Sequence, residues 1–272
     1  MTKILVATDF SPASRNALHV ACMIAQLSED SVTLFHVKNS YTKSLLADVD
    51  KNPEELDSYM DDLSSTAAER FNVKCDYKVQ DGSIFSDINE LASKQEYRFI
   101  LLGTHGVKGI RQSLFGADIL KIAGDAPVPV MAVPDKAEPS NFLEKIVFPY
   151  GGHTHFERKV KVVSFLAKLF DSEIHLYSVE REGMPISEET RLNIEKAREH
   201  FSSNGISHKM VSEKMEDFSI GFAHQTMRYA QSIQAKLIAV MASTSEKFAF
   251  ISEVDKEALI NNKEGIGVLL TA

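Results

Sequence analysis

The chain has 272 residues, which is enough for one large domain or two of ordinary size, and its 44% hydrophobic content is typical of globular proteins. Its net charge of −8, without any dense block of Lys and Arg, argues against nucleic-acid binding, because neutralising phosphates requires a basic face. No apolar run approaches the length of a membrane span, and the first residues carry no signal-peptide pattern. Cys22 and Cys75 are too few for a disulfide framework or a metal knuckle. We therefore expect a cytoplasmic protein with reduced thiols.

The first predicted unit is a strand, a loop and a helix. Residues 3–8 form an apolar run typical of a buried strand. Ser11 can cap the following helix, and Pro12 can occupy its first position, where a missing N–H costs nothing. The apolar stripe of this helix consists of Ala17, Val20, Ala21, Ile24 and Leu27.

Strands and helices then alternate through the first half of the chain. Further strands are expected at residues 31–37, 74–79, 99–102 and 128–133, and helices at residues 52–71, 84–92 and 117–123, while residues 41–50 read as a long connection. This alternation predicts a parallel sheet with helices on both faces. Ligands of such sheets bind at the carboxyl ends of the strands.

A glycine-rich loop follows the buried strand at residues 99–102. Glycines can adopt positive φ and let peptide N–H groups approach a bound anion closely. These glycines are Gly103, Gly106, Gly109 and Gly116, with Lys108 and Arg111 among them. The loop resembles a phosphate site in outline, although most such turns only reverse the chain. Neither the dinucleotide-binding spacing nor the P-loop pattern is present.

The second half of the chain repeats the first. Residues 2–37 align without a gap on residues 144–179, and residues 99–133 align on residues 237–271. The charged, Pro-bearing segment 135–141 reads as a linker. Two copies of one α/β domain, at residues 1–138 and 139–272, are the simplest account.

The loop chemistry is not repeated. Thr8 and Asp9 are replaced in the second copy by Tyr150 and Gly151. The three glycines Gly103, Gly106 and Gly116 are replaced by Met241, Thr244 and Val254. The second copy is therefore expected to keep the fold and to lack the nucleotide motif.

These residues carry a resemblance to the universal stress protein family, as a tandem pair of its domains. The nucleotide motif of the family is Gly, two residues, Gly, nine residues, Gly, then Ser or Thr, and Gly103, Gly106 and Gly116 stand at this spacing. The resemblance implies two doubly wound, Rossmann-like domains, each a five-stranded parallel sheet in the order 3-2-1-4-5. It also implies a pseudo-twofold pairing of the domains through their last strands, an internal pseudo-dimer that can itself form a homodimer.

The resemblance further implies a site for ATP, with or without Mg²⁺, in the first copy. In ATP-binding members, the Asp after the first strand contacts the adenosine, and the residue that ends the second strand packs near the adenine. Carried over by position, the implied binding residues are Thr8, Asp9, Val37, Gly103, His105, Gly106, Gly116 and Ala117.

One departure from the motif is Ala117, which stands where the family has Ser or Thr. Its amide remains, but a hydroxyl that could bond a terminal phosphate oxygen is missing. A lost hydrogen bond to a charged group is worth roughly 1.5 to 3 kcal/mol, or about one to two decades in affinity. AMP, ADP or another adenine-containing ligand therefore stays open beside ATP.

Two functions follow from these patterns. The first is a stress-response protein whose N-terminal domain binds ATP or a related adenine nucleotide as a regulatory ligand, while the C-terminal domain serves pairing and scaffolding. The alternative is a nucleotide-independent scaffold or chaperone-like module for a protein or lipid partner.

ATP hydrolysis ranks last and would be slow, because no convincing base, metal-ligand pair or arginine finger is visible. His105 has no partnering acid at a telling spacing, and the pair His153 and His155 is weak as a metal signal, so no catalytic or metal residue is assigned.

Overall fold

The computed structural model describes residues 2–94, 96–104, 116–151, 156–180, 186–214, 221–242 and 252–271. The N-terminal half contains β1 (Lys3–Ala7), α1 (Pro12–Ser28), β2 (Ser31–Lys38), α2 (Thr42–Ala47), the 3₁₀ turn η1 (Pro53–Glu55), α3 (Leu56–Phe71), β3 (Cys75–Asp81), α4 (Ile84–Lys94), β4 (Tyr97–Thr104), α5 (Gly116–Asp125) and β5 (Val130–Pro134). The C-terminal half contains η2 (Pro139–Asn141), β6 (Lys145–Pro149), α6 (Phe156–Phe170), β7 (Glu173–Glu180), α7 (Glu188–Ser203), β8 (His208–Lys214), α8 (Phe222–Ser232), β9 (Leu237–Met241), α9 (Glu253–Ile260) and β10 (Gly267–Thr271).

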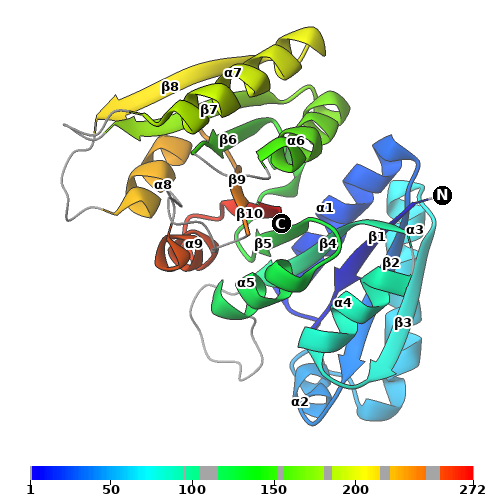
Figure 1. Ribbon diagram of the computed structural model, residues 1–272. Helices are drawn as coiled ribbons and strands as arrows, with labels where there is room; N and C mark the ends of the chain where they lie inside the picture. Colours follow the sequence, from blue (N-terminus) through cyan, green and yellow to red (C-terminus); the bar gives the residue numbers. More distant parts are fainter. Residues whose placement is uncertain are drawn as a thin grey trace.

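The strands of the described residues form one continuous sheet. Its order is β3-β2-β1-β4-β5-β10-β9-β6-β7-β8, so each half has the predicted order 3-2-1-4-5. Pairing is parallel within each half and antiparallel between β5 and β10, where Val268 is opposite Ala132 and Leu270 is opposite Val130. The two halves therefore meet through their last strands, at the centre of the molecule (Figure 1). The expectation of two doubly wound α/β domains is confirmed.

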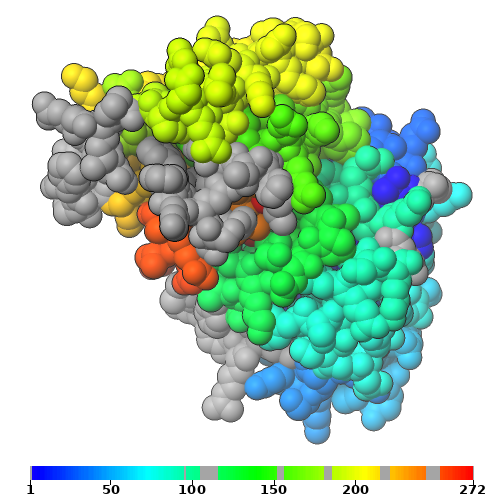
Figure 2. All heavy atoms as spheres, in the orientation of Figure 1, coloured from blue at the N-terminus to red at the C-terminus, as the bar shows by residue number. Residues whose placement is uncertain are grey.

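Helices cover both faces of the sheet. One hydrophobic core joins α1, α2 and α3 with α6 and α7, and a second core joins α4 and α5 with α8 and α9 on the other face. Each core contains residues of both halves, because the sheet between the helices is continuous. In Figure 2 the orange-red residues of α9 border the green residues at the junction of the halves.

The entry into α1 follows the sequence expectation. Ser11 is the N-cap, and its Oγ accepts a hydrogen bond from the Ser14 amide at 3.1 Å, while Pro12 occupies the first helical position. The predicted stripe is buried except for Leu27, which is 50% exposed. Leu27 lies in the last turn of α1, two residues before the left-handed C-cap Glu29. Helical spacing alone does not reveal where the sheet beneath a helix stops.

Helix α2 differs from the sequence expectation, which is a long connection at residues 41–50. It has six residues, too few for a 3.6-residue period to appear in the sequence. Its position is fixed by burial of Leu45 and Leu46 in the core, together with a hydrogen bond from the Asn39 amide to Thr42 Oγ1 at 3.0 Å. Tertiary packing, rather than the local sequence pattern, therefore determines where this helix forms.

The linker after β5 is attached to α1. Asn16 Nδ2 donates to the carbonyls of Pro134, Asp135 and Ala137 at 3.2, 2.8 and 3.3 Å. Pro134 ends β5, and Asp135 and Ala137 belong to the irregular segment after it, so one side chain contacts three carbonyls where the strand ends. The Asn16 side chain thereby holds the start of the linker against α1.

Candidate functional site

The candidate site lies at the carboxyl edge of the N-terminal half. β1 is paired with β2 on one side and with β4 on the other, and Ala7 is opposite both Phe35 and Leu102. The chain then continues from β1 to α1 on one face and from β4 to α5 on the other. The carboxyl ends of β1 and β4 therefore form the switch point, the place at which ligands of open α/β sheets bind. Thr8, Asp9, Val37 and Gly103 all lie at this edge.

Thr8 holds the turn that follows β1. Its Oγ1 accepts a hydrogen bond from the Phe10 amide at 3.1 Å and lies 3.2 Å from Ser14 Oγ. Phe10 is buried with a φ of 66°, a left-handed conformation that is unusual for a bulky residue. A backbone outlier that the surroundings hold in place is typical of functional sites. Thr8 itself is buried, so its hydroxyl serves the turn in this structure.

Asp9 lies on this turn and is half-buried. Its Oδ1 accepts hydrogen bonds from the amide and the hydroxyl of Ser11, at 3.1 and 2.5 Å. Asp9 thus supports the entry into α1, which is the role expected of an acid just before a helix. These two contacts hold the carboxylate in the turn after β1.

His36 is a buried residue of this edge that sequence reasoning missed. Its Nδ1 lies 2.9 Å from the Thr8 carbonyl and its Nε2 lies 3.1 Å from Thr42 Oγ1. A carbonyl only accepts hydrogen bonds, so we assign the proton to Nδ1. Burial lowers the pKa of His36, while the Thr8 carbonyl and the Asp9 charge act in the opposite direction. The imidazole also stacks on Phe10, with ring centroids 4.6 Å apart. The sequence signal for a buried His here was its position within the mostly apolar strand β2.

Val37 is 6% exposed and belongs to the core on the face of α4 and α5.

Gly103 lies in β4, and a Cβ on it would be 2.4 Å from the Ser14 amide nitrogen and 2.6 Å from the Ala13 carbonyl carbon. The absence of a side chain at Gly103 therefore lets the first turn of α1 pack directly on β4. His105 and Gly106 lie outside the described residues.

Gly116 and Ala117 begin α5, where the first amides have no partner within the helix. Ala117 is exposed. The Gly116 amide donates instead to Asn261 Oδ1 of the C-terminal half, at 2.9 Å. The structure thus places the last glycine of the motif at the junction of the two halves.

The corresponding edge of the C-terminal half has different chemistry. Strands β6 and β9 pair only at Val147 with Ile238 and at Ile146 with Leu237, whereas the pairing of β1 with β4 continues to the end of β1. Lys159 of α6 is 1% exposed, and its Nζ donates to the Pro149 carbonyl at 2.5 Å. Burial and then the charge of Lys256 lower the pKa of Lys159 to about 7.

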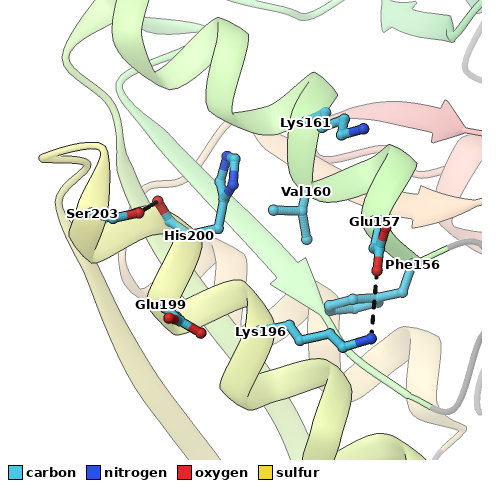
Figure 3. Close-up of a pocket in the computed structure, with 8 residues that line it drawn as sticks. All are labelled: Phe156, Glu157, Val160, Lys161, Lys196, Glu199, His200 and Ser203. Atoms are coloured by element: carbon cyan, nitrogen blue, oxygen red, sulfur yellow. Dashed lines mark hydrogen bonds and ion pairs between the residues drawn. The ribbon is translucent and has the colours of Figure 1, made fainter.

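A separate hollow of about 340 Å³ lies between α6 and α7 (Figure 3). The buried side chains of Phe156 and Val160 line it, and Lys196 Nζ is 3.5 Å from Glu157 Oε1. It is formed by the C-terminal half, away from the carboxyl ends of β1 and β4. No motif residue lines it, so it is not the candidate site.

Comparison with known families gives a match for residues 1–134, to the universal stress protein family. A solved universal stress protein from Archaeoglobus fulgidus DSM 4304 is similar to the whole chain, with a TM-score of 0.72 and 16% identity over 99% of this chain and 97% of that one. A functionally unknown protein from Pseudomonas aeruginosa PAO1 has a TM-score of 0.60 and 16% identity over 100% and 92% of the two chains. The cytoplasmic domain of a prokaryotic cation chloride cotransporter has a TM-score of 0.55 and 11% identity over 99% and 94%. At these identities the likeness concerns the fold alone.

Comparison with curated proteins gives no match. Within the described part of the chain, no helix combines the length and apolar character needed to cross a membrane.

Proposed function

Since the chain belongs to the universal stress protein family through residues 1–134, we propose that its N-terminal half binds ATP or a related adenine nucleotide as a regulatory ligand. The site comprises residues of the domain at 1–138, and the domain at 139–272 serves pairing and scaffolding. The protein acts in the cytoplasm, in a stress response, and the nucleotide is bound with or without Mg²⁺.

The observation that carries this proposal is the convergence of motif residues at one switch point. Thr8 and Asp9 follow β1, Val37 lies near the end of β2, and Gly103 lies in β4, which flanks β1. These three strands are neighbours in the sheet although they are distant in the sequence. A ligand lying across their carboxyl ends would lie next to all four residues.

Each residue has an assigned role in the proposal. The Asp9 carboxylate accepts a hydrogen bond from the adenosine part, and Val37 borders the adenine. Gly103, His105 and Gly106 line the phosphate side. The first amides of α5, at Gly116 and Ala117, face the phosphates, where the positive end of the helix dipole favours negative charge.

Isothermal titration of the full chain with ATP, ADP and AMP, with and without Mg²⁺, tests the proposal. Asp9→Asn keeps the Oδ1 acceptor that Ser11 uses but removes the charge, and it should weaken binding about tenfold or more. Asp76→Asn is the matched control, because Asp76 lies near the amino end of β3 and contacts Lys3 at 3.4 Å. Wild-type protein that gives no heat at millimolar nucleotide would reject the proposal.

A second candidate function is a nucleotide-independent scaffold for a protein or lipid partner. The occupied Gly116 amide and the missing hydroxyl at Ala117 favour it, because both reduce the phosphate contacts available to a nucleotide. The two functions differ in one measurable respect. Small molecules released from freshly purified protein should include an adenine nucleotide under the first and none under the second, as read by mass spectrometry.

A further inference from the structure

A side chain of the C-terminal half occupies the first amide of α5. Gly116 N donates to Asn261 Oδ1 at 2.9 Å, across 145 positions of sequence. Asn261 is the C-cap of α9, and its own amide donates to the Glu257 carbonyl at 2.9 Å. One end of α9 therefore caps the beginning of α5, and this cap is supplied from the other half of the molecule.

The contact is close because Gly116 has no side chain. A Cβ on this residue would lie 2.9 Å from Asn261 Nδ2 and 2.9 Å from the Glu257 carbonyl oxygen. The Glu257 carbonyl is part of the helix backbone, whereas the Asn261 amide can rotate about its side-chain bonds. An anion that takes the Gly116 amide therefore has to displace the Asn261 side chain.

We propose that Asn261 sets the affinity of the nucleotide site by competing with a ligand phosphate for the Gly116 amide, an inference that rests on the function proposed above. One N–H makes one strong hydrogen bond, so the phosphate and the Asn261 carbonyl exclude each other. Nucleotide binding in the N-terminal half is then linked to the contact between α5 and α9. By reciprocity, loosening this contact strengthens binding, and binding loosens the contact.

Two substitutions at Asn261 separate competition from a merely structural role. Asn261→Ala removes the competing acceptor and should tighten nucleotide binding about fivefold, the equivalent of one neutral hydrogen bond. Asn261→Asp places a carboxylate at the positive end of α5, where it holds the amide more strongly and repels phosphate. This variant should bind at least tenfold more weakly. A merely structural role would instead weaken binding in Asn261→Ala, which loses the contact with the Gly116 amide, and spare Asn261→Asp, which keeps it.

The experiment is isothermal titration of the full chain with ATP, using wild type, both variants and Asn262→Ala. Asn262 is the matched control, because it bonds to the Leu259 and Ile266 carbonyls at 2.7 and 2.6 Å, next to Asn261 on the same helix end. Its removal should leave the affinity unchanged. Amide hydrogen exchange at Gly116 should also accelerate in Asn261→Ala and stay at the wild-type rate in Asn262→Ala.

The expected order of affinity is Asn261→Ala, then wild type, then Asn261→Asp. Equal affinities, or weaker binding by Asn261→Ala, would overturn the role of Asn261 and leave nucleotide binding itself standing. Binding by none of the four proteins would overturn the nucleotide function and this inference together. Binding by Asn261→Ala alone would overturn the nucleotide function proposed for the wild type and leave the competition at Gly116 standing.

Discussion

Gly103 and Gly116 have packing roles in addition to their proposed roles in ligand binding. A Cβ on Gly103 would collide with the backbone of α1 at Ser14, and a Cβ on Gly116 would collide with α9 at Glu257. Two glycines of the motif therefore also stand where a helix packs too closely to leave room for a side chain. Binding and packing at these positions can be separated by measuring stability and affinity on the same variant.

The first prediction concerns Gly103→Ala, which should lower the free energy of unfolding by about 1–3 kcal/mol, because the new methyl group overlaps backbone atoms that cannot rotate away. Urea unfolding followed by circular dichroism measures this change. Gly124→Ala is the control, since nothing lies within 4 Å of its Cβ position and it belongs to α5. Alanine there should stabilise the protein by about 0.5–1 kcal/mol. Equal stabilities of the two variants would contradict the packing role.

Helices α6 and α9 each place a buried lysine against the carboxyl edge of the second half. Lys159 Nζ bonds to the Pro149 carbonyl and lies 4.1 Å from the centroid of the Phe148 ring. Lys256 of α9 is fully buried, and its Nζ donates to the Ala242 carbonyl at 3.4 Å. Both hydrogen bonds end on backbone carbonyls that follow or end neighbouring strands. The second half therefore has the same helices and strands at this edge as the first half, but different side chains between them.

The second prediction concerns the pH dependence of stability that Lys159 causes. Its pKa is about 7 in the folded protein and 10.5 ordinarily, so between these values the folded state binds fewer protons than the unfolded state. Stability should therefore rise with pH across this window, by at most about 1.4 kcal/mol per pH unit from this group. Lys159→Met should remove this slope, as measured by urea unfolding at pH 7, 8 and 9. Parallel curves for variant and wild type would show that Lys159 is not the group responsible.

Contacts between the N-terminal and C-terminal halves stabilise the molecule as a whole. β5 and β10 join the two halves of the sheet, and both cores contain residues of both halves. The Arg98 guanidinium of β4 lies 4.5 Å from the centroid of the Phe165 ring of α6. Gly267 of β10 packs so closely that a Cβ would lie 2.3 Å from Phe142 Cζ and 2.9 Å from the Ala132 carbonyl oxygen. Part of the hydrophobic surface of each half is therefore buried against the other half.

The third prediction is therefore one cooperative unfolding transition for the full chain in scanning calorimetry, with equal calorimetric and van't Hoff enthalpies. Gly267→Val should separate the halves and divide the transition into two, because the new side chain overlaps Phe142 at the junction. Gly205→Ala tests a surface glycine with nothing within 4 Å, although its φ of 67° makes alanine mildly strained. It should lower the midpoint and leave a single transition. Two transitions in the wild type would mean that the halves unfold independently.

The order of elements, the repeat and the helix caps were readable in the sequence, because each depends on residues within a few positions of one another or on a constant offset. The capping of α1 by Ser11 is an example. The six-residue helix α2, the exposed Leu27 and the buried His36 were not readable, since their environments come from elements elsewhere in the chain. The same holds for the candidate site. Its motif is a local spacing, but Asn261 reaches Gly116 only because β5 and β10 pair and bring α9 against α5.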